Sequence, residues 1–96
     1  MFQAGKSLAN RHGVLYIRHT GLEFTRPGFV VGRTAGKAVC RNRIKRVFRE
    51  AYRLTAERVQ PGYDLVFVAR HAAKEAGLSV IIQAVVDLLE RGGVLR

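Results

Sequence analysis

The chain has 96 residues and a hydrophobic fraction of 48%, which suits one small domain with a modest core and excludes wholesale disorder. Seventeen Lys and Arg residues against seven Asp and Glu residues give a formal net charge of +10, so the expected partner is a polyanion, nucleic acid first. The most apolar stretch, residues 78–89, is too short to span a bilayer, and the N-terminus has no apolar segment resembling a signal peptide. We therefore expect one soluble, cytoplasmic domain over residues 1–96.

The first third of the chain predicts two strands. Residues 14–18 are β-branched and aromatic, which favours a strand. Gly21 and the Arg-Pro-Gly run at residues 26–28 indicate turns. A second strand is expected after them, from residue 29 to residue 34.

The rest of the chain predicts a helix, a strand and a second helix. Residues 38–58 contain no Gly or Pro and repeat apolar side chains at helical spacing. Residues 63–69 form a near-continuous apolar run, typical of a strand covered on both faces. Residues 78–89 predict an amphipathic helix that Gly92 and Gly93 end. This order of elements indicates a two-layer α/β sandwich, with helices packed on a sheet.

The predicted helix over residues 38–58 carries the most unusual charge pattern. Eight of the seventeen basic residues lie between Arg33 and Arg53, where Glu50 is the only acid. At about 100° per residue, one arc of about 140° gathers the polar side chains Arg41, Asn42, Lys45, Arg46, Arg49 and Arg53. The nearly opposite arc gathers the apolar side chains Ile44, Val47, Phe48, Ala51 and Leu54.

This division favours a helix with one side for the core and one for phosphate. A solvated charged side is the alternative. However, like charges four residues apart cost a few tenths of a kcal/mol each, and a helix that accepts this repulsion is better explained by an anionic partner. Cys40, the only cysteine, cannot form an internal disulfide, which fits a reducing compartment. It lies at the edge of the apolar arc, so we expect a buried structural thiol.

The segment from Gly36 to Arg46, Gly-Lys-Ala-Val-Cys-Arg-Asn-Arg-Ile-Lys-Arg, closely resembles the signature of the bacterial ribonuclease P protein family. Residues 2–16, with Phe2 and Gly5, then Ala-Asn-Arg and Val-Leu-Tyr, resemble the family's first strands, and residues 63–70 resemble its last strand. The resemblance covers nearly the whole chain in order. It implies an α+β fold, a two-layer α/β sandwich of the ribosomal protein S5 domain 2-like type. In that fold the sheet is mixed and the predicted basic helix forms a left-handed βαβ crossover.

The resemblance also implies a function. Proteins of this family have no nuclease centre of their own. They are the accessory subunit of an endoribonuclease, bind the catalytic ribonuclease P RNA and the 5′ leader of precursor tRNA, and assist removal of the leader. The Mg²⁺ ions for cleavage are bound by the RNA subunit and not by a dedicated protein site. The leader lies in a cleft between the sheet and the flanking helices, and the basic helix lies close to the catalytic RNA.

Carried onto this sequence, the resemblance implies that Phe2 and Tyr16 stack on leader bases. Thr34 takes the second position of a basic pair that the family places after the second strand, so one phosphate contact is expected to be weaker or absent. The full set of expected RNA-binding residues is Arg33, Lys37, Arg41, Asn42, Arg43, Lys45, Arg46, Arg49 and Arg53. Because the sequence begins almost at the first strand, it lacks the family's usual N-terminal helix, and we expect part of the leader cleft to be missing.

No catalytic or metal-binding residue is predicted in the protein itself. The three histidines, His12, His19 and His71, are scattered without ligand spacing and are expected in loops or on the surface. The seven carboxylates form no Asp-x-Asp pair or similar cluster of the kind that metal-dependent nucleases need. Glu50 and Glu57 are expected to form surface ion pairs with nearby arginines.

Three other functions agree less well with the sequence. A ribosomal or other RNA-scaffolding protein would explain the charge and the small α/β fold, but not the ordered match along the chain. A DNA-binding regulator is disfavoured because no short-turn helix precedes the basic helix, as helix-turn-helix geometry requires. A membrane-surface role is disfavoured because the basic helix belongs to a folded core.

Overall fold

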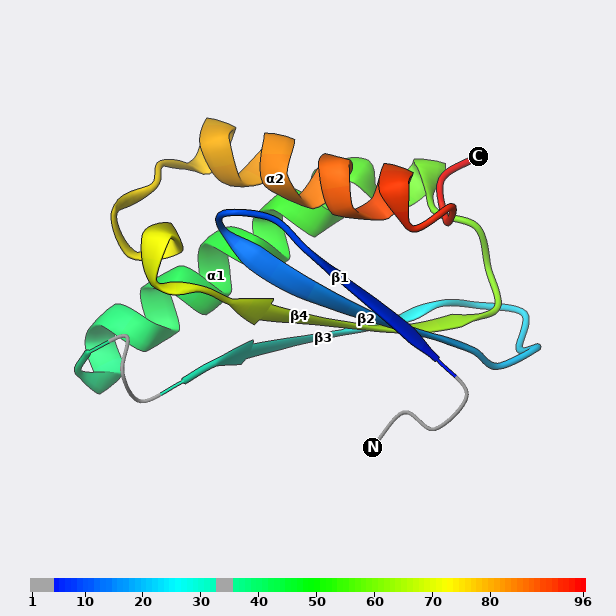
Figure 1. Cartoon of the computed structure of the whole chain (residues 1–96), viewed down its shortest axis with the longest axis horizontal. Helices are drawn as coiled ribbons and strands as arrows, with labels where there is room; N and C mark the ends of the chain where they lie inside the picture. Colours follow the sequence, from blue (N-terminus) through cyan, green and yellow to red (C-terminus); the bar gives the residue numbers. More distant parts are fainter. Residues whose placement is uncertain (1–4, 33–35) are drawn as a thin grey trace.

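The computed structural model describes residues 5–32 and 36–96. Figure 1 shows a sheet of four strands beneath two long helices. In chain order the elements are β1 (Lys6–Ala9), β2 (Gly13–His19), β3 (Arg26–Val31), α1 (Ala38–Thr55), the 3₁₀ turn η2 (Ala56–Arg58), β4 (Tyr63–Ala69), the 3₁₀ turn η3 (His71–Glu75) and α2 (Leu78–Arg91).

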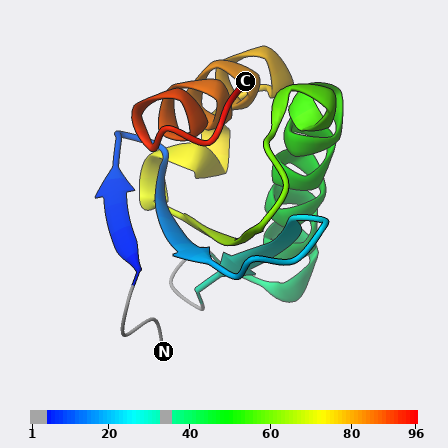
Figure 2. The same cartoon turned by 90° about the vertical axis from the view of Figure 1, so that its right-hand side faces the viewer.

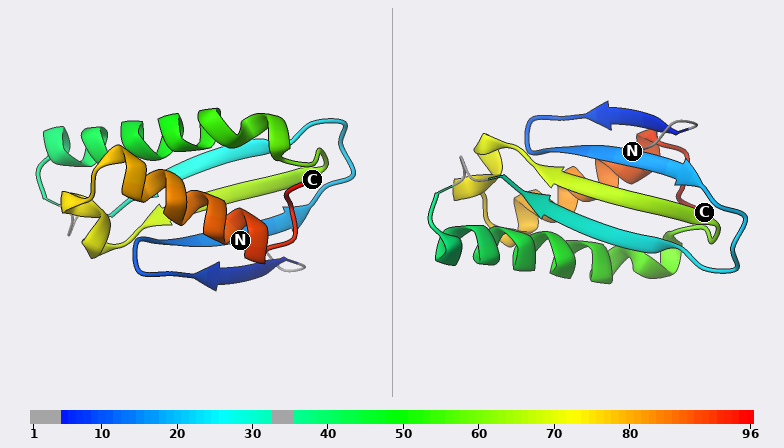
Figure 3. Two further views of the ribbon diagram at one scale, coloured as in Figure 1. Left: turned by 90° about the horizontal axis from the view of Figure 1, so that it is seen from above. Right: turned by 90° about the horizontal axis from the view of Figure 1, so that it is seen from below.

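The sheet is mixed, with the strand order β1-β2-β4-β3. The pairs β1/β2 and β2/β4 are antiparallel, whereas β3 and β4 are parallel and are joined through α1. In the right-hand view of Figure 3 the helices lie behind the sheet, β3 and β4 point left, and the chain passes from the lower strand to the upper one. That crossover is left-handed, against the usual rule. The expected α+β sandwich is therefore confirmed.

Several boundaries differ from the sequence-based expectation. Residue propensities do not predict the strand β1, because Lys-Ser-Leu-Ala contains no β-branched or aromatic residue, although β1 lies within residues 2–16, which resemble the family's first strands. The strand β3 begins at Arg26 rather than at residue 29, and Pro27 lies within it. This is possible because β3 is an edge strand, where a missing N–H need not break a hydrogen-bonded ladder. The expected continuation of this strand to residue 34 extends into residues 33–35, which lie outside the described residues.

Both helices cover the same face of the sheet (Figure 2), so the expectation that β4 is covered on both faces is wrong. Leu65 and Phe67 of β4 point toward the helices and are buried. Val66 and Val68 alternate with them on the other face and are only half-buried. We call this other face, which neither helix covers, the open face of the sheet.

The core lies between the sheet and the two helices. Leu15 of β2, Phe48 of α1 and Leu88 of α2 are all almost completely inaccessible to solvent. Gly92 ends α2 against β2 at very close range. A Cβ atom on Gly92 would lie 2.5 Å from Cδ1 of Ile17 and 3.0 Å from the carbonyl oxygen of Leu88, so a larger residue here would force the Ile17 side chain to move and crowd the helix end.

Candidate nucleic-acid interface

The helix α1 buries a different set of side chains from the one its spacing predicted. Ile44, Phe48 and Ala51 are buried as expected. Leu54, however, is 51% exposed, and Tyr52 and Thr55 are buried instead, which corrects the predicted apolar arc. The buried arc is thus rotated toward β3.

An aromatic cluster explains this rotation. The rings of Tyr52, Phe29 of β3 and Phe67 of β4 have centroids 5.7–6.2 Å apart, so Tyr52 fills the space between α1 and the edge of the sheet. The Thr55 hydroxyl donates to the carbonyl oxygens of Ala51 at 3.2 Å and Tyr52 at 3.0 Å. Its polar group is therefore satisfied inside the protein.

The predicted RNA-binding side chains of α1 stay on the solvent side of the helix. We call this side the basic face, and its members are Arg41, Asn42, Lys45, Arg46, Arg49 and Arg53. Arg41 and Lys45 are half-buried and the other four are exposed. The Arg49 guanidinium lies 5.9 Å from the centroid of the Phe29 ring, which directs part of this face toward the β3 edge.

Charge on the basic face is largely unneutralised by carboxylates. Within the described ranges, Arg53 is the only residue of this face with an ion-pair partner. Its Nε and Nη2 donate to the two carboxylate oxygens of Glu50 at 2.9 and 2.5 Å, and this bidentate bond lowers the pKa of Glu50. The expected pairing is therefore confirmed for Glu50, whereas Glu57 forms no ion pair among the described residues. Lys37 takes the N-cap position of α1, where it is exposed, and the first turn contains no acid.

A shallow groove of about 450 Å³ runs between α1 and the start of α2. We call it the interhelical groove. It is lined by Arg43, Arg46, Val47, Arg49, Glu50, Arg53 and Leu78. Arg43 was predicted to bind RNA. It lies outside the basic face and lines the interhelical groove.

Tyr16 lies apart from the basic face. It is 37% exposed on β2 and alternates with Leu15 and Ile17, which are buried beneath the helices. It therefore points to the open face, beside its register partner Val66 of β4, and not into the expected cleft between the sheet and the flanking helices, because the core fills the space beneath α1 and α2. An RNA strand contacting both Tyr16 and α1 would have to pass around the β3 edge. The other expected stacking residue, Phe2, and the expected phosphate contact Arg33 lie outside the described residues, as does Thr34.

A second group of arginines and histidines was not predicted from the sequence. Arg11 and His12, in the β1–β2 turn, and Arg70 and His71, which follow β4, line one pocket of about 690 Å³. We call these four residues the turn cluster. The backbone N–H of Arg70 donates to the His12 carbonyl oxygen at 3.0 Å, which joins the two segments. No pattern in the sequence points to this group, because its halves lie almost sixty positions apart.

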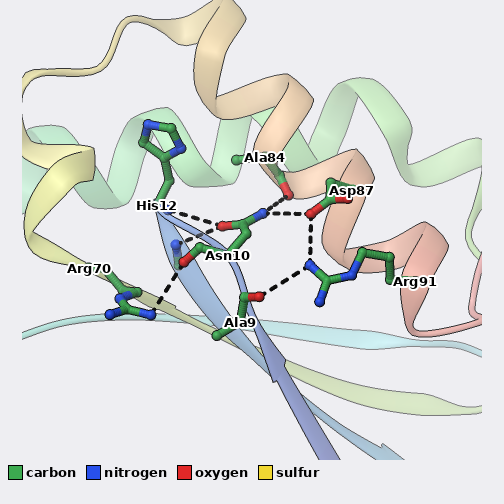
Figure 4. A network of polar contacts seen from close by, with 8 residues as sticks. Ala9, Asn10, His12, Arg70, Ala84, Asp87 and Arg91 are labelled. Atoms are coloured by element: carbon green, nitrogen blue, oxygen red, sulfur yellow. Dashed lines mark hydrogen bonds and ion pairs between the residues drawn. The ribbon is translucent and has the colours of Figure 1, made fainter.

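The turn cluster is supported by a polar network around Asn10 (Figure 4). Asn10 Oδ1 accepts from the backbone N–H groups of His12 at 3.0 Å and Gly13 at 3.1 Å. Asn10 Nδ2 donates to the carbonyl oxygen of Ala84 and to Asp87 Oδ2 on α2, both at 3.0 Å. The hydrogen bond from Asn10 to Asp87 and a second one from Arg91 lower the pKa of Asp87.

A further pocket joins the turn cluster to α1. It is lined by Cys40, Arg43, His71, Lys74 and Glu75, so His71 and Glu75 border both this pocket and that of the turn cluster. Cys40 is exposed there, and the prediction of a buried thiol is wrong, because the first turn of α1 projects beyond the core. The basic surface therefore extends from α1 across η3 to the β1–β2 turn.

No group of three His, Cys, Asp or Glu side chains that could hold a metal ion is found in the part of the chain that the structure describes. The same residues include no helix that is both long and apolar enough to cross a membrane.

Residues 1–93 match the family model described as Ribonuclease P. A ribonuclease P protein component from Alkaliphilus oremlandii is 41% identical, over 95% of this chain and 80% of its own. One from Symbiobacterium thermophilum is 44% identical, over 100% of this chain and 84% of its own.

Solved structures agree with this. A variant of the Staphylococcus aureus RNase P protein has a TM-score of 0.88 at 31% identity, over 97% of this chain and 79% of its own. The Thermotoga maritima RNase P protein has a TM-score of 0.85 at 34% identity, over 93% of this chain and 87% of its own.

Proposed function

Because the chain belongs to the ribonuclease P protein family, we propose that it is the protein subunit of ribonuclease P. In this role it binds the catalytic ribonuclease P RNA and the 5′ leader of precursor tRNA. It assists the endonucleolytic cut that makes the mature 5′ end of tRNA, and the RNA subunit carries the catalytic centre.

The observation that carries this proposal is the basic face of α1. Its apolar side is fixed in the core by Phe48 and Tyr52, so the orientation of the opposite side is fixed as well. Arginines on a rigid helix can form paired hydrogen bonds with phosphate oxygens at little further cost in conformational entropy. Each neutralised phosphate also releases counterions, which makes the affinity strongly dependent on salt.

The open face of the sheet supports the proposal for the leader. Tyr16 and Val66 are register partners there, and Val30 of the edge strand β3 is 48% exposed. A partly exposed ring among short apolar side chains suits unpaired bases, which stack without regard to sequence. Tyr16 is thus the proposed stacking residue among those that the structure describes.

Mg²⁺ is the proposed metal of the complex, bound by the RNA subunit. A net charge of +10 repels divalent cations from the protein and attracts the phosphates that bind them. The protein's own contribution is then to hold the two RNA molecules together and to screen the repulsion between their backbones.

A cleavage assay tests this function. The protein is added to a bacterial ribonuclease P RNA and a precursor tRNA with a 5′ leader, at a low Mg²⁺ concentration where the RNA alone cleaves slowly. We expect faster release of the leader and tighter binding of the precursor, with little gain in affinity for mature tRNA, which has no leader. A protein that binds the RNA but changes neither quantity would be an RNA-scaffolding protein instead.

A further inference from the structure

The interhelical groove combines two features that rarely occur together on a charged surface. Its base is apolar, because Val47 is half-buried against the core and Leu78, the first residue of α2, is 41% exposed. Its rim is cationic, with arginines from three successive turns of α1 and Glu50 as the one acid. A single exposed leucine needs no explanation, but an apolar surface enclosed by guanidinium groups does.

The chemistry of the rim selects the class of ligand. An apolar peptide could cover Val47 and Leu78, but it would leave the guanidinium groups of Arg43 and Arg46 without acceptors. A bare phosphate would satisfy these groups and leave the apolar base exposed. An unpaired nucleotide meets both demands, since its base offers a flat apolar face and its backbone carries phosphates on either side.

Arg53 adds a fixed element to this rim. Glu50 accepts two hydrogen bonds from its guanidinium, at 2.9 and 2.5 Å, and this bidentate pair favours one orientation of the plane before any ligand binds. Guanidinium planes stack on nucleobases, and a plane held by a carboxylate loses less entropy on stacking. This gives a function to the one acid on an otherwise basic stretch of helix.

We propose that the interhelical groove binds an unpaired base of the RNA partner, with the base on Val47 and Leu78 and its flanking phosphates on Arg43 and Arg46. The proposal rests on the proposed function, because it assumes that α1 faces RNA. It differs from that function in requiring an apolar contact, which depends on the base and not on salt.

Leu78→Ser removes the apolar contact at an exposed position and keeps the charge. Leu54→Ser is the matched control, because Leu54 is also an exposed leucine, at 51% against 41% for Leu78, and lies on α1 outside the groove. The affinity for ribonuclease P RNA is measured over a series of salt concentrations. We expect Leu78→Ser to weaken binding roughly five- to tenfold at every salt concentration, with the salt slope unchanged, and Leu54→Ser to bind like the parent protein.

Two further variants separate a failure of the base-binding proposal from a failure of the RNA-binding role of α1. Leu78→Tyr offers a ring for stacking and should bind at least as tightly as the parent protein. Arg46→Ala should flatten the salt slope by about 0.7–0.9.

If Arg46→Ala flattens the slope while the serine and tyrosine variants at residue 78 bind like the parent, the groove holds no base and the wider function stands. An unchanged slope for Arg46→Ala would instead contradict the RNA-binding role of α1. A change in sedimentation mass for Leu78→Ser with unaltered RNA affinity would make the groove a contact between copies of the chain.

Discussion

The basic face of α1 and the turn cluster both present arginines to solvent, but they are supported differently. The basic face lies on one continuous helix, and Phe48 and Tyr52 anchor the helix on the opposite side. The turn cluster joins two distant segments that the β2–β4 pairing brings together, and its β1–β2 turn is held by the hydrogen bonds of Asn10 and by one backbone bond from Arg70. A surface of the first kind should tolerate the loss of any one polar contact, whereas a surface of the second kind should not.

The largest expected effect comes from removing the side chain that anchors the basic face. Phe48 is 2% exposed, and Phe48→Ala should lower the free energy of unfolding by about 3–5 kcal/mol because it leaves a large cavity. Chemical denaturation followed by circular dichroism measures this loss. The control Leu54→Ala, at an exposed position of the same helix, should change stability by less than about 0.5 kcal/mol. Equal losses for the two variants would mean that the described burial of α1 is wrong.

The polar support of the turn cluster is tested by Asn10→Ala. The substitution leaves the N–H groups of His12 and Gly13 without their acceptor and unties the turn from α2. We expect a loss of about 1–3 kcal/mol in unfolding free energy. Hydrogen exchange should also become faster in the β1–β2 turn, with no change within α1. Exchange that rises equally in both regions would show that the two surfaces are not supported independently.

The polar network around Asn10 should also make stability depend on pH, because Asp87 has a pKa below its ordinary value of 3.8 in the folded protein. Its carboxylate binds fewer protons when folded than when unfolded, so its contribution to stability is present above pH 3.8 and is lost as pH falls through the lower folded pKa. The pKa values of Glu50 and Asp64 are lowered in the same direction by Arg53 and Arg26, so the parent protein should lose stability from all three.

Asp87→Asn separates the contribution of Asp87 from the other two. The variant should be less stable than the parent near pH 6, and the difference should shrink toward pH 2. The effect is expected to be modest, because the Asp87 side chain is 43% exposed and solvent screens its interactions. Denaturation at the two pH values is the measurement, and a difference that stays constant with pH would exclude a role for the Asp87 charge.

The elements that the sequence predicted correctly are those with a local signal. The spacing of Ile44 and Phe48 located the buried side of α1, and the run of residues 63–69 located β4. The exposed Leu54 and the buried Thr55 could not be predicted, because the packing of Tyr52 against two strands sets the rotation of the helix. Helical spacing defines an arc but not its exact rotation toward its neighbours.

The residues of the candidate site also differ in whether a local pattern in the sequence predicts them. Every predicted contact from Arg41 to Arg53 follows from one stretch of sequence, and the structure places them along a single helix. The turn cluster is created by the β2–β4 pairing, which brings residues 11–12 beside residues 70–71, and no local pattern encodes that contact. The assignment of these side chains to catalytic RNA or to leader stays a prediction.

The central claim is that the basic face of α1 binds RNA phosphates, and the salt dependence of binding tests it most directly. The affinity for ribonuclease P RNA is measured over a salt series for the parent protein, for Arg49→Ala and for Lys6→Ala, a control on the opposite edge strand β1. The account predicts that Arg49→Ala lowers the slope of log affinity against log salt by about 0.7–0.9, while Lys6→Ala leaves it unchanged. Identical slopes for the parent and Arg49→Ala, or a loss confined to Lys6→Ala, would contradict it.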